Sequence, residues 1–224
     1  KITERTAGVV LESIQGGAGF IEPQNNYLIK VKRRCEEVGA LLIIDEIQPG
    51  FGRTGKLFGF QNYGFTPDII AIGKGMASGM PVGAFVSSYE RMQLLAHSPK
   101  MGHITTFGGN PVIAAASLAT LNQLLTTDLM AQTLEKEKLF RQYLQHPLIE
   151  SVNGKGLMLA VIVKTAEIAD FVVNYCQDRG LIVYWLLFEH RAVRLSPPLT
   201  LTEEEIKEGC DIILEALNQV EKSF

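Results

Sequence analysis

The sequence predicts an α/β fold, in which a mostly parallel sheet belongs to a large domain and a small α+β domain follows it. Residues 40–44 and 68–72 are short apolar runs rich in Ile and Leu, which is typical of parallel strands buried on both faces. A similar run at residues 7–12 is followed by apolar residues at helical spacing between positions 25 and 38. Strand, helix and strand therefore follow one another as a βαβ unit.

The later elements continue this alternation in a different form. Residues 83–87 are expected to run antiparallel to 68–72, because the connection is too short for a crossover helix. Further elements are predicted as helices at 112–125 and 129–145, strand 157–163, helix 167–179, strands 181–187 and 192–195, and helix 203–220, which starts with a capping box of Thr202 and Glu205. We expect residues 1–110 to form part of the large domain, 111–146 to bridge, and 147–224 to form the small domain.

Composition indicates small-molecule chemistry. The chain has 224 residues, 46% of them hydrophobic, and a formal net charge of −3, with Lys and Arg scattered, so nucleic acid is not an expected partner. Cys35, Cys176 and Cys210 are odd in number and far apart, which predicts neither a disulfide framework nor a zinc site and fits a reducing cytoplasm. No apolar run approaches the roughly 18 residues that span a bilayer, so a membrane is not expected either.

Two of the predicted parallel strands lead directly into a charged residue. Asp45 follows the run at 40–44, and Lys74 follows the run at 68–72 after a single glycine. In open α/β sheets the ligand crevice lies beyond the carboxyl ends of the strands, so both side chains are expected there. A lysine for the aldehyde and an aspartate for the ring nitrogen are typical of a pyridoxal phosphate (PLP) site.

A purely structural interpretation remains open for both Lys74 and Asp45. Lys74 between two glycines is also typical of an exposed turn, and Asp45 of a helix cap or a solvated strand end. A nucleotide loop is less favoured, because the spacing G-x-G-x-x-x-G is one residue longer than the dinucleotide fingerprint. The four histidines form no metal-binding pattern.

Two further stretches carry candidate ligand groups. Thr105 and Thr106 precede FGGNP, where hydroxyls and the amides of a helix start favour a phosphate, although a plain helix-entry turn explains the same residues. Arg194 lies in a β-type run before Ser-Pro-Pro, where a guanidinium is able to hold a carboxylate in two parallel bonds.

Five motifs, in this order and spacing, resemble the class III PLP-dependent aminotransferases of fold type I, the ornithine, acetylornithine and 4-aminobutyrate group: LESIQGGAG, IIDEIQPGFGRTGK, PDIIAIGKG, TTFGGNP and RLSPPLT. The resemblance covers nearly the whole chain. It implies that Lys74 is the Schiff-base lysine, that Asp45 pairs with the pyridinium nitrogen, and that Ile47 packs on the ring. It also implies that Gln48 contacts the phenolic oxygen of the ring.

The resemblance further implies a homodimer with shared active sites. Thr106, with Thr105 beside it, resembles the phosphate ligand that this family contributes across the dimer interface. Arg194 resembles the anchor for a substrate carboxylate, and Glu12, in the first motif, is predicted as a second substrate-binding residue. The reaction implied is a two-stage transfer of an amino group from an amino acid or ω-amine to an oxo acid such as 2-oxoglutarate.

Two departures from the family pattern matter. The family's N-terminal half, with its glycine/serine phosphate loop and ring-stacking aromatic residue, has no counterpart, and the chain opens abruptly, so residues are expected to precede Lys1. Gly17 stands where ornithine-type members carry a glutamate, which weakens the ornithine assignment. The alternatives are a truncated, non-catalytic remnant of such an enzyme, or a PLP decarboxylase or racemase of the same fold.

Overall fold

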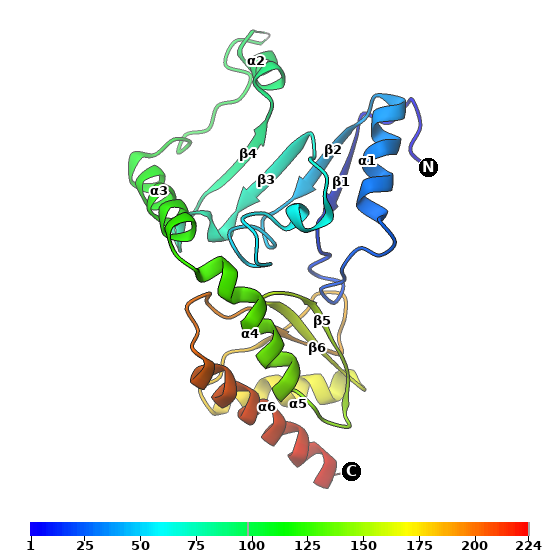
Figure 1. The fold of residues 1–224 in the computed structure, drawn as a ribbon, viewed down its shortest axis with the longest axis vertical. Coiled ribbons are helices and arrows are strands. Elements are labelled where there is room, and N and C mark those ends of the chain that lie inside the picture. The colour runs from blue at the N-terminus through cyan, green and yellow to red at the C-terminus, as the bar shows by residue number, and fades with distance from the viewer. Residues whose placement is uncertain (98, 224) are drawn as a thin grey trace. The chain divides into compact units, whose positions relative to one another are not determined.

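The computed structural model describes residues 1–97 and 99–223, which form two compact units (Figure 1). The first unit comprises residues 1–13, 23–51 and 58–127, and the second comprises 14–22, 52–57 and 128–224. Two loops that follow strands of the first unit therefore belong to the second. The boundary at residue 127 separates the two helices that we expected to bridge the domains; the assignment of 1–110 and 147–224 to family domains stays a prediction.

The first unit contains a mixed four-stranded sheet in the order β1-β2-β3-β4. The strands β1 (Gly8–Glu12), β2 (Leu41–Asp45) and β3 (Ile69–Gly73) are parallel. The last strand, β4 (Gly83–Ser87), is antiparallel to β3, with Gly73 opposite Gly83. The predicted parallel pairing and the antiparallel final strand are both confirmed.

Helix α1 (Tyr27–Val38) packs on one face of this sheet (Figure 1). Its buried residues Leu28, Val31 and Cys35 pack with Leu42 and Ile44 of β2. Because side chains alternate along a strand, Asp45 and its neighbours at odd positions of β2 point to the opposite face. The helix ends at Gly39, whose φ of 76° allows its N–H to reach the carbonyls of Cys35 and Glu36.

Shorter elements complete the first unit. Two 3-10 helices, η1 (Gly59–Tyr63) and η2 (Lys74–Ala77), lie in the loops after β2 and β3. Helix α3 (Pro111–Thr126) is close to its predicted bounds. Helix α2 (Tyr89–His97) was not predicted, and it has no buried residue.

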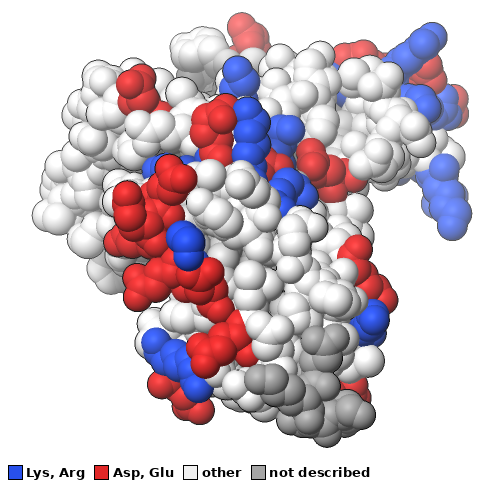
Figure 2. Space-filling view, turned by 60° about the horizontal axis from the view of Figure 1, so that its bottom comes forward, with Lys and Arg blue, Asp and Glu red and all other residues white. Residues whose placement is uncertain are grey.

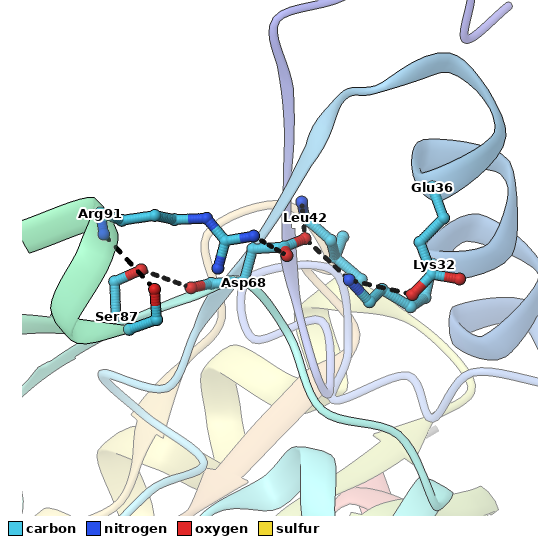
Figure 3. A network of polar contacts seen from close by, with 7 residues as sticks. Lys32, Glu36, Leu42, Asp68, Ser87 and Arg91 are labelled. Atoms are coloured by element: carbon cyan, nitrogen blue, oxygen red, sulfur yellow. Dashed lines mark hydrogen bonds and ion pairs between the residues drawn. The ribbon is translucent and has the colours of Figure 1, made fainter.

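Asp68, just before β3, joins several elements at the amino ends of the strands (Figure 3). Its Oδ2 atom accepts hydrogen bonds from the N–H of Leu42 at 2.8 Å and from Lys32 Nζ at 2.9 Å, and its Oδ1 atom accepts from Arg91 at 2.8 Å. Its backbone carbonyl accepts from the Ser87 hydroxyl at 2.7 Å. Burial raises the pKa of Asp68, but these donors and the two cations outweigh it, so the pKa lies below its usual value.

The second unit contains an antiparallel sheet in the order β5-β6-β8-β7. Its strands are β5 (Ile149–Lys155), β6 (Met158–Val163), β7 (Tyr184–Trp185) and β8 (Ala192–Leu195). Its helices are α4 (Leu129–Tyr143), α5 (Ala166–Asp178) and α6 (Glu203–Ser223), and α6 has the predicted capping box, with Thr202 N–H to Glu205 at 2.8 Å and the reciprocal bond at 3.2 Å.

Strand β6 is buried on both faces because it lies between two apolar clusters. Alternate residues such as Leu159 and Val161 join the large cluster that includes residues of α4, α5 and α6. The others, Met158 and Ala160, pack with Ile14 and Phe20 of the loop after β1, so this loop covers the second face of the small sheet.

Two strands of the second unit differ from the prediction. Strand β5 was missed, because its sequence IESVNGK is mostly polar and does not alternate cleanly. Strand β7 has only two of the residues predicted as a strand over 181–187. It is the edge strand, and within residues 181–187 only Tyr184 and Trp185 pair with β8.

Acidic and basic side chains intermingle on the face shown in Figure 2. Many charged side chains of the chain pair within one helix, such as Lys207 with Asp211 at 2.6 Å and Lys138 with Glu135 at 2.8 Å. Such exposed pairs are screened by solvent and define no ligand site. Among the described residues, no helix combines the length and apolar character needed to cross a membrane.

Candidate functional site

Asp45 and Lys74 leave neighbouring parallel strands at the same edge of the sheet. Asp45 is the last residue of β2, and its Cα is paired with Ala71 of β3 and with Glu12, the last residue of β1. Lys74 directly follows Gly73, the last residue of β3. The fold therefore brings Glu12, Asp45 and Lys74 to the carboxyl ends of three adjacent parallel strands, where ligand sites of α/β sheets are built.

The two side chains have polar atoms available for a ligand. The Oδ1 atom of Asp45 accepts a hydrogen bond from the N–H of Ile47 at 2.9 Å, which orients the carboxylate. Within the described residues, the second oxygen of Asp45 has no hydrogen-bond donor, and the amine of the exposed Lys74 has no ion-pair partner. One carboxylate oxygen of Asp45 and the amine of Lys74 are thus available to a ligand at this edge of the sheet.

The turn after β2 packs against both glycines that flank Lys74. A Cβ atom built on Gly73 would lie 3.7 Å from Cγ1 of Ile47, and one built on Gly75 would lie 3.3 Å from Cβ of Phe51. The apolar side chain of Ile47 thus lies beside the backbone that leads into Lys74. This arrangement fits a flat ring, because Ile47 supplies an apolar surface next to the residues that would bind its two polar ends.

The backbone of this region is strained at two bulky residues. Lys74 has a φ of 43° and Phe51 a φ of 56°, values in the left-handed region that side chains larger than glycine disfavour. Each such residue costs about 1–3 kcal/mol, and such conformations concentrate at ligand sites, where the surrounding structure enforces them. Ser78, at the end of η2, has a φ of 45°.

Glu46 is a further residue of this site that the sequence analysis missed. It is completely buried, and its two carboxylate oxygens accept hydrogen bonds from the N–H groups of Gly59 at 2.6 Å and Phe60 at 2.8 Å. Burial raises the pKa of Glu46, and the two N–H donors only partly oppose this, with the charge of Asp45 adding to the rise. The one sequence feature that could have indicated Glu46 was its place as the second acidic residue after the apolar run at 40–44.

Thr105 and Thr106 also belong to the first unit. They line a cavity of about 650 Å³ together with Met76, Gly83 and the segment 107–110, and neither Asp45 nor Lys74 lines this cavity. The start of α3 is occupied by its own cap. Pro111 has no N–H, the side chain of Asn110 accepts from Val112 at 3.0 Å and Ile113 at 3.4 Å, and its carbonyl accepts from Ala114.

The first-turn N–H groups of α3 are therefore satisfied within the helix cap. A phosphate bound at this position would therefore need donors outside the first turn, such as the two threonine hydroxyls.

Arg194 belongs to the second unit, in strand β8. Its Nε atom is buried without an acceptor, and its guanidinium lies 5.2 Å from the ring centre of Tyr184. Both residues line a cavity of about 290 Å³ with Pro197 and Glu205. Arg194 forms no ion pair within the described part of the chain, so the guanidinium has unused donors for a carboxylate.

Gly17 lies in the second unit next to Phe188. The N–H of Phe188 donates to the carbonyl of Gly17 at 2.9 Å, and a Cβ atom on Gly17 would lie 3.1 Å from Cδ2 of Phe188. The exposed aromatic ring of Phe188 thus lies beside the backbone of Gly17. Gln48 lies in the turn after Asp45 with a partly exposed side chain.

An α/β sheet that brings a lysine and an aspartate to one edge fits the class of proteins that hold a ring cofactor between an amine and an acid. The comparisons identify the family within this class. The family model described as aminotransferase class-III matches residues 1–217. The chain therefore belongs to the class III aminotransferase family, and the resemblance drawn from the five motifs is confirmed.

Several relatives are similar over nearly the whole chain. The putrescine aminotransferase of Pectobacterium atrosepticum is 40% identical over 95% of this chain and 48% of its own length. The acetylornithine aminotransferase of Caldanaerobacter subterraneus is 35% identical over 98% of this chain and 55% of its own. The chain thus spans about half the length of these relatives.

Solved structures of the family share the fold. The ornithine aminotransferase from Toxoplasma gondii ME49 matches with a TM-score of 0.90 and 30% identity, over 99% of this chain and 53% of that one. An (S)-enantioselective omega-transaminase from Thermomicrobium roseum matches with a TM-score of 0.85 and 32% identity, over 94% of this chain and 50% of that one. The predicted α/β fold of the PLP fold type I large domain is thereby confirmed, in part of its length.

Proposed function

We propose that this chain takes part in the PLP-dependent transfer of an amino group from an amino acid or ω-amine to an oxo acid. The observation that carries the proposal is the placement of Asp45 and Lys74 at adjacent strand ends, with Ile47 packed beside the backbone before Lys74. The family membership and the aminotransferase names of the relatives support it. PLP is also named at the active site of a Toxoplasma gondii ornithine aminotransferase that shares this fold.

Each residue of the site has a distinct role in this proposal. When bound, PLP supplies an aldehyde that takes up the amino group and a ring that accepts electron density from the substrate carbon. Lys74 would hold the aldehyde through Nζ and, once the amino donor has displaced it, would move a proton between the reacting carbon atoms. The free oxygen of Asp45 holds a proton on the ring nitrogen. Ile47 packs on the ring, and Gln48 donates to its phenolic oxygen.

Arg194 is proposed to bind the substrate carboxylate, with Glu12 as a second substrate contact. The buried Nε without an acceptor and the absence of an ion pair within the described residues support this role for Arg194. Gly17 offers no carboxylate to neutralise it. We therefore favour donors and acceptors that carry a carboxylate, such as an acetylornithine-like donor and 2-oxoglutarate.

Thr105 and Thr106 are proposed to bind the cofactor phosphate of a partner subunit in a homodimer. They line a cavity to which Asp45 and Lys74 do not contribute. Large apolar side chains around them are exposed, including Met101 at 68%, Ile104 at 67% and Phe107 at 79%, and exposed apolar surface of this kind is typical of an interface. The three cysteines are free and buried, which agrees with the proposed reducing cytoplasm.

Incubation of the purified protein with PLP, candidate amines and 2-oxoglutarate tests the proposal through the formation of glutamate. Glutamate in the wild type and none in Lys74→Ala is the expected result. Release of carbon dioxide or loss of optical activity without glutamate would instead identify the decarboxylase or racemase alternative. A wild-type protein that binds no PLP would support the non-catalytic remnant, as would an intact mass below that encoded by its gene.

A further inference from the structure

Glu46 has no role in the proposed reaction, but its carboxylate connects the two ends of the loop that carries the proposed cofactor contacts. Glu46 directly follows Asp45, and its carboxylate accepts the N–H groups of Gly59 at 2.6 Å and Phe60 at 2.8 Å. Both donors belong to η1, at the far end of the loop that begins at Glu46. One buried side chain thus holds the two ends of this loop together.

The backbone of Glu46 is also fully engaged. Its N–H donates to the carbonyl of Ala71 at 2.8 Å, which extends the pairing of β2 with β3 one residue beyond Asp45. Its carbonyl accepts the N–H of Gly50 at 3.0 Å, which closes the turn that contains Ile47 and Gln48. The direction in which Asp45 leaves the sheet is therefore fixed by three separate groups of the next residue.

The packing around this carboxylate leaves no room for adjustment. A Cβ atom on Gly59 would lie 2.8 Å from Cβ of Pro49 and 3.2 Å from Oε2 of Glu46. A Cβ atom on Gly50 would lie 2.6 Å from the carbonyl oxygen of Glu46. Because Gly50 and Gly59 have no side chain, their backbone N–H groups can approach Glu46 closely enough to form hydrogen bonds with it.

We propose that Glu46 is the positioning residue of the cofactor site. It fixes the turn so that Asp45, Ile47 and Gln48 face the ring, and it touches neither cofactor nor substrate. The inference rests on the proposed function, because it assumes that PLP binds between Asp45 and Lys74. In a Glu46→Gln variant one acceptor becomes an NH₂ donor, so the N–H of Gly59 or Phe60 loses its partner and the loop loosens.

A matched control is available at the opposite end of the strands. Asp68 also accepts a backbone N–H and is largely buried, but it lies at the amino ends of β2 and β3 (Figure 3). Glu46→Gln and Asp68→Asn each replace one such carboxylate by its amide, so both variants are expected to lower the free energy of unfolding. Only Glu46→Gln is expected to disturb the site.

Two measurements compare the variants. Titration with PLP, followed by its absorbance, should show a dissociation constant raised about tenfold or more in Glu46→Gln and nearly unchanged in Asp68→Asn, since one lost hydrogen bond to a charged group is worth about that factor. Hydrogen exchange should show that the amide of Ile47, which donates to Asp45, loses protection in Glu46→Gln only. Glu46→Asp, which keeps the charge but shortens the side chain, serves if the glutamine variant does not fold.

Equal loss of PLP affinity in the Glu46 and Asp68 variants would overturn the positioning role, as would unchanged protection of Ile47 in the Glu46 variant. A different result would count against the proposed function itself: no covalent adduct on wild-type Lys74 after borohydride reduction with PLP. In that case the exchange of the Ile47 amide still decides whether Glu46 fixes the turn.

Discussion

The carboxylate of Asp45 accepts a hydrogen bond from the backbone N–H of Ile47, two residues further along the chain, at 2.9 Å. One oxygen is thereby used to set the orientation of the side chain, and the other has no hydrogen-bond donor among the described residues. The same short turn places the side chain of Ile47 beside Gly73. Orientation of the acid and placement of the apolar surface are therefore properties of a single turn.

Asp45→Asn separates the charge of this residue from its structural role. The amide oxygen of asparagine can still accept the N–H of Ile47, so the melting temperature should be unchanged. The loss of a charge-assisted hydrogen bond of about 1.5–3 kcal/mol should lower the rate of amino transfer about 10- to 100-fold. Single-turnover kinetics with a saturating donor measure the rate, and an unchanged rate would remove Asp45 from its proposed role.

We expect Asp68 to stabilise the folded protein in a way that is lost in acid. Its pKa is lowered in the folded protein, so its contribution is complete above the unfolded value of about 3.9 and is lost as the pH falls through the folded pKa. Asp68→Asn should lower the free energy of unfolding at pH 7 by about 1.5–3 kcal/mol and flatten its dependence on pH below about 4.

Urea unfolding at pH 7 and at acidic pH checks this expectation. Glu36→Gln is the control, because Glu36 also pairs with Lys32, at 3.3 Å, but its side chain is 61% exposed. The control should change stability by less than about 1 kcal/mol. Equal effects of the two substitutions would contradict the role assigned to Asp68.

Arg53 contributes a buried cation to the second unit. Its guanidinium donates to the carbonyl of Leu157 at 3.2 Å and to that of Pro197, and burial lowers the pKa of Arg53 to about 10. Arg53→Gln should lower the free energy of unfolding by about 1–3 kcal/mol, since at least one buried carbonyl loses its donor. Arg33→Gln, at a side chain that is 82% exposed, should leave the denaturation curve unchanged.

The three cysteines should be inert in the folded protein. Burial raises the pKa of Cys176 to about 11 and that of Cys210 to about 12, and it also raises the pKa of Cys35. Because the thiolate is the reactive form, a thiol reagent at pH 8 should modify these residues slowly in the native state and all three rapidly in denaturant. Rapid modification of the native protein would show that one of the thiols is accessible.

Much of the fold could be predicted from the sequence because its signals are local. The continuous apolar runs marked β2 and β3, and the short link after β3 required β4 to turn back. Strand β5 escaped prediction because it is mostly polar and depends on pairing with β6, and helix α2, which buries no residue, also escaped prediction. The division at residue 127 was also unpredicted, because compactness depends on contacts between distant segments.

In the candidate site, too, only residues marked by a local sequence pattern could be predicted. Asp45 and Lys74 could be identified because each follows a recognisable strand. Glu46 could not, because its importance depends on two N–H groups more than ten residues away in sequence. The roles of Thr105, Thr106 and Arg194 stay predictions, although the structure shows the free donors of Arg194 and the self-capped helix after the threonines.

By itself the sequence determined the fold class, the parallel order of β1 to β3 and the residues at their carboxyl ends, since hydrophobic patterns act over a few neighbouring positions. Only the tertiary structure decided which of these residues meet and how they are held. It placed Ile47 and Phe51 against the glycines around Lys74 and buried Glu46 beneath the turn. These outcomes depend on close packing and on hydrogen bonds between distant segments, which exist only once the chain has folded.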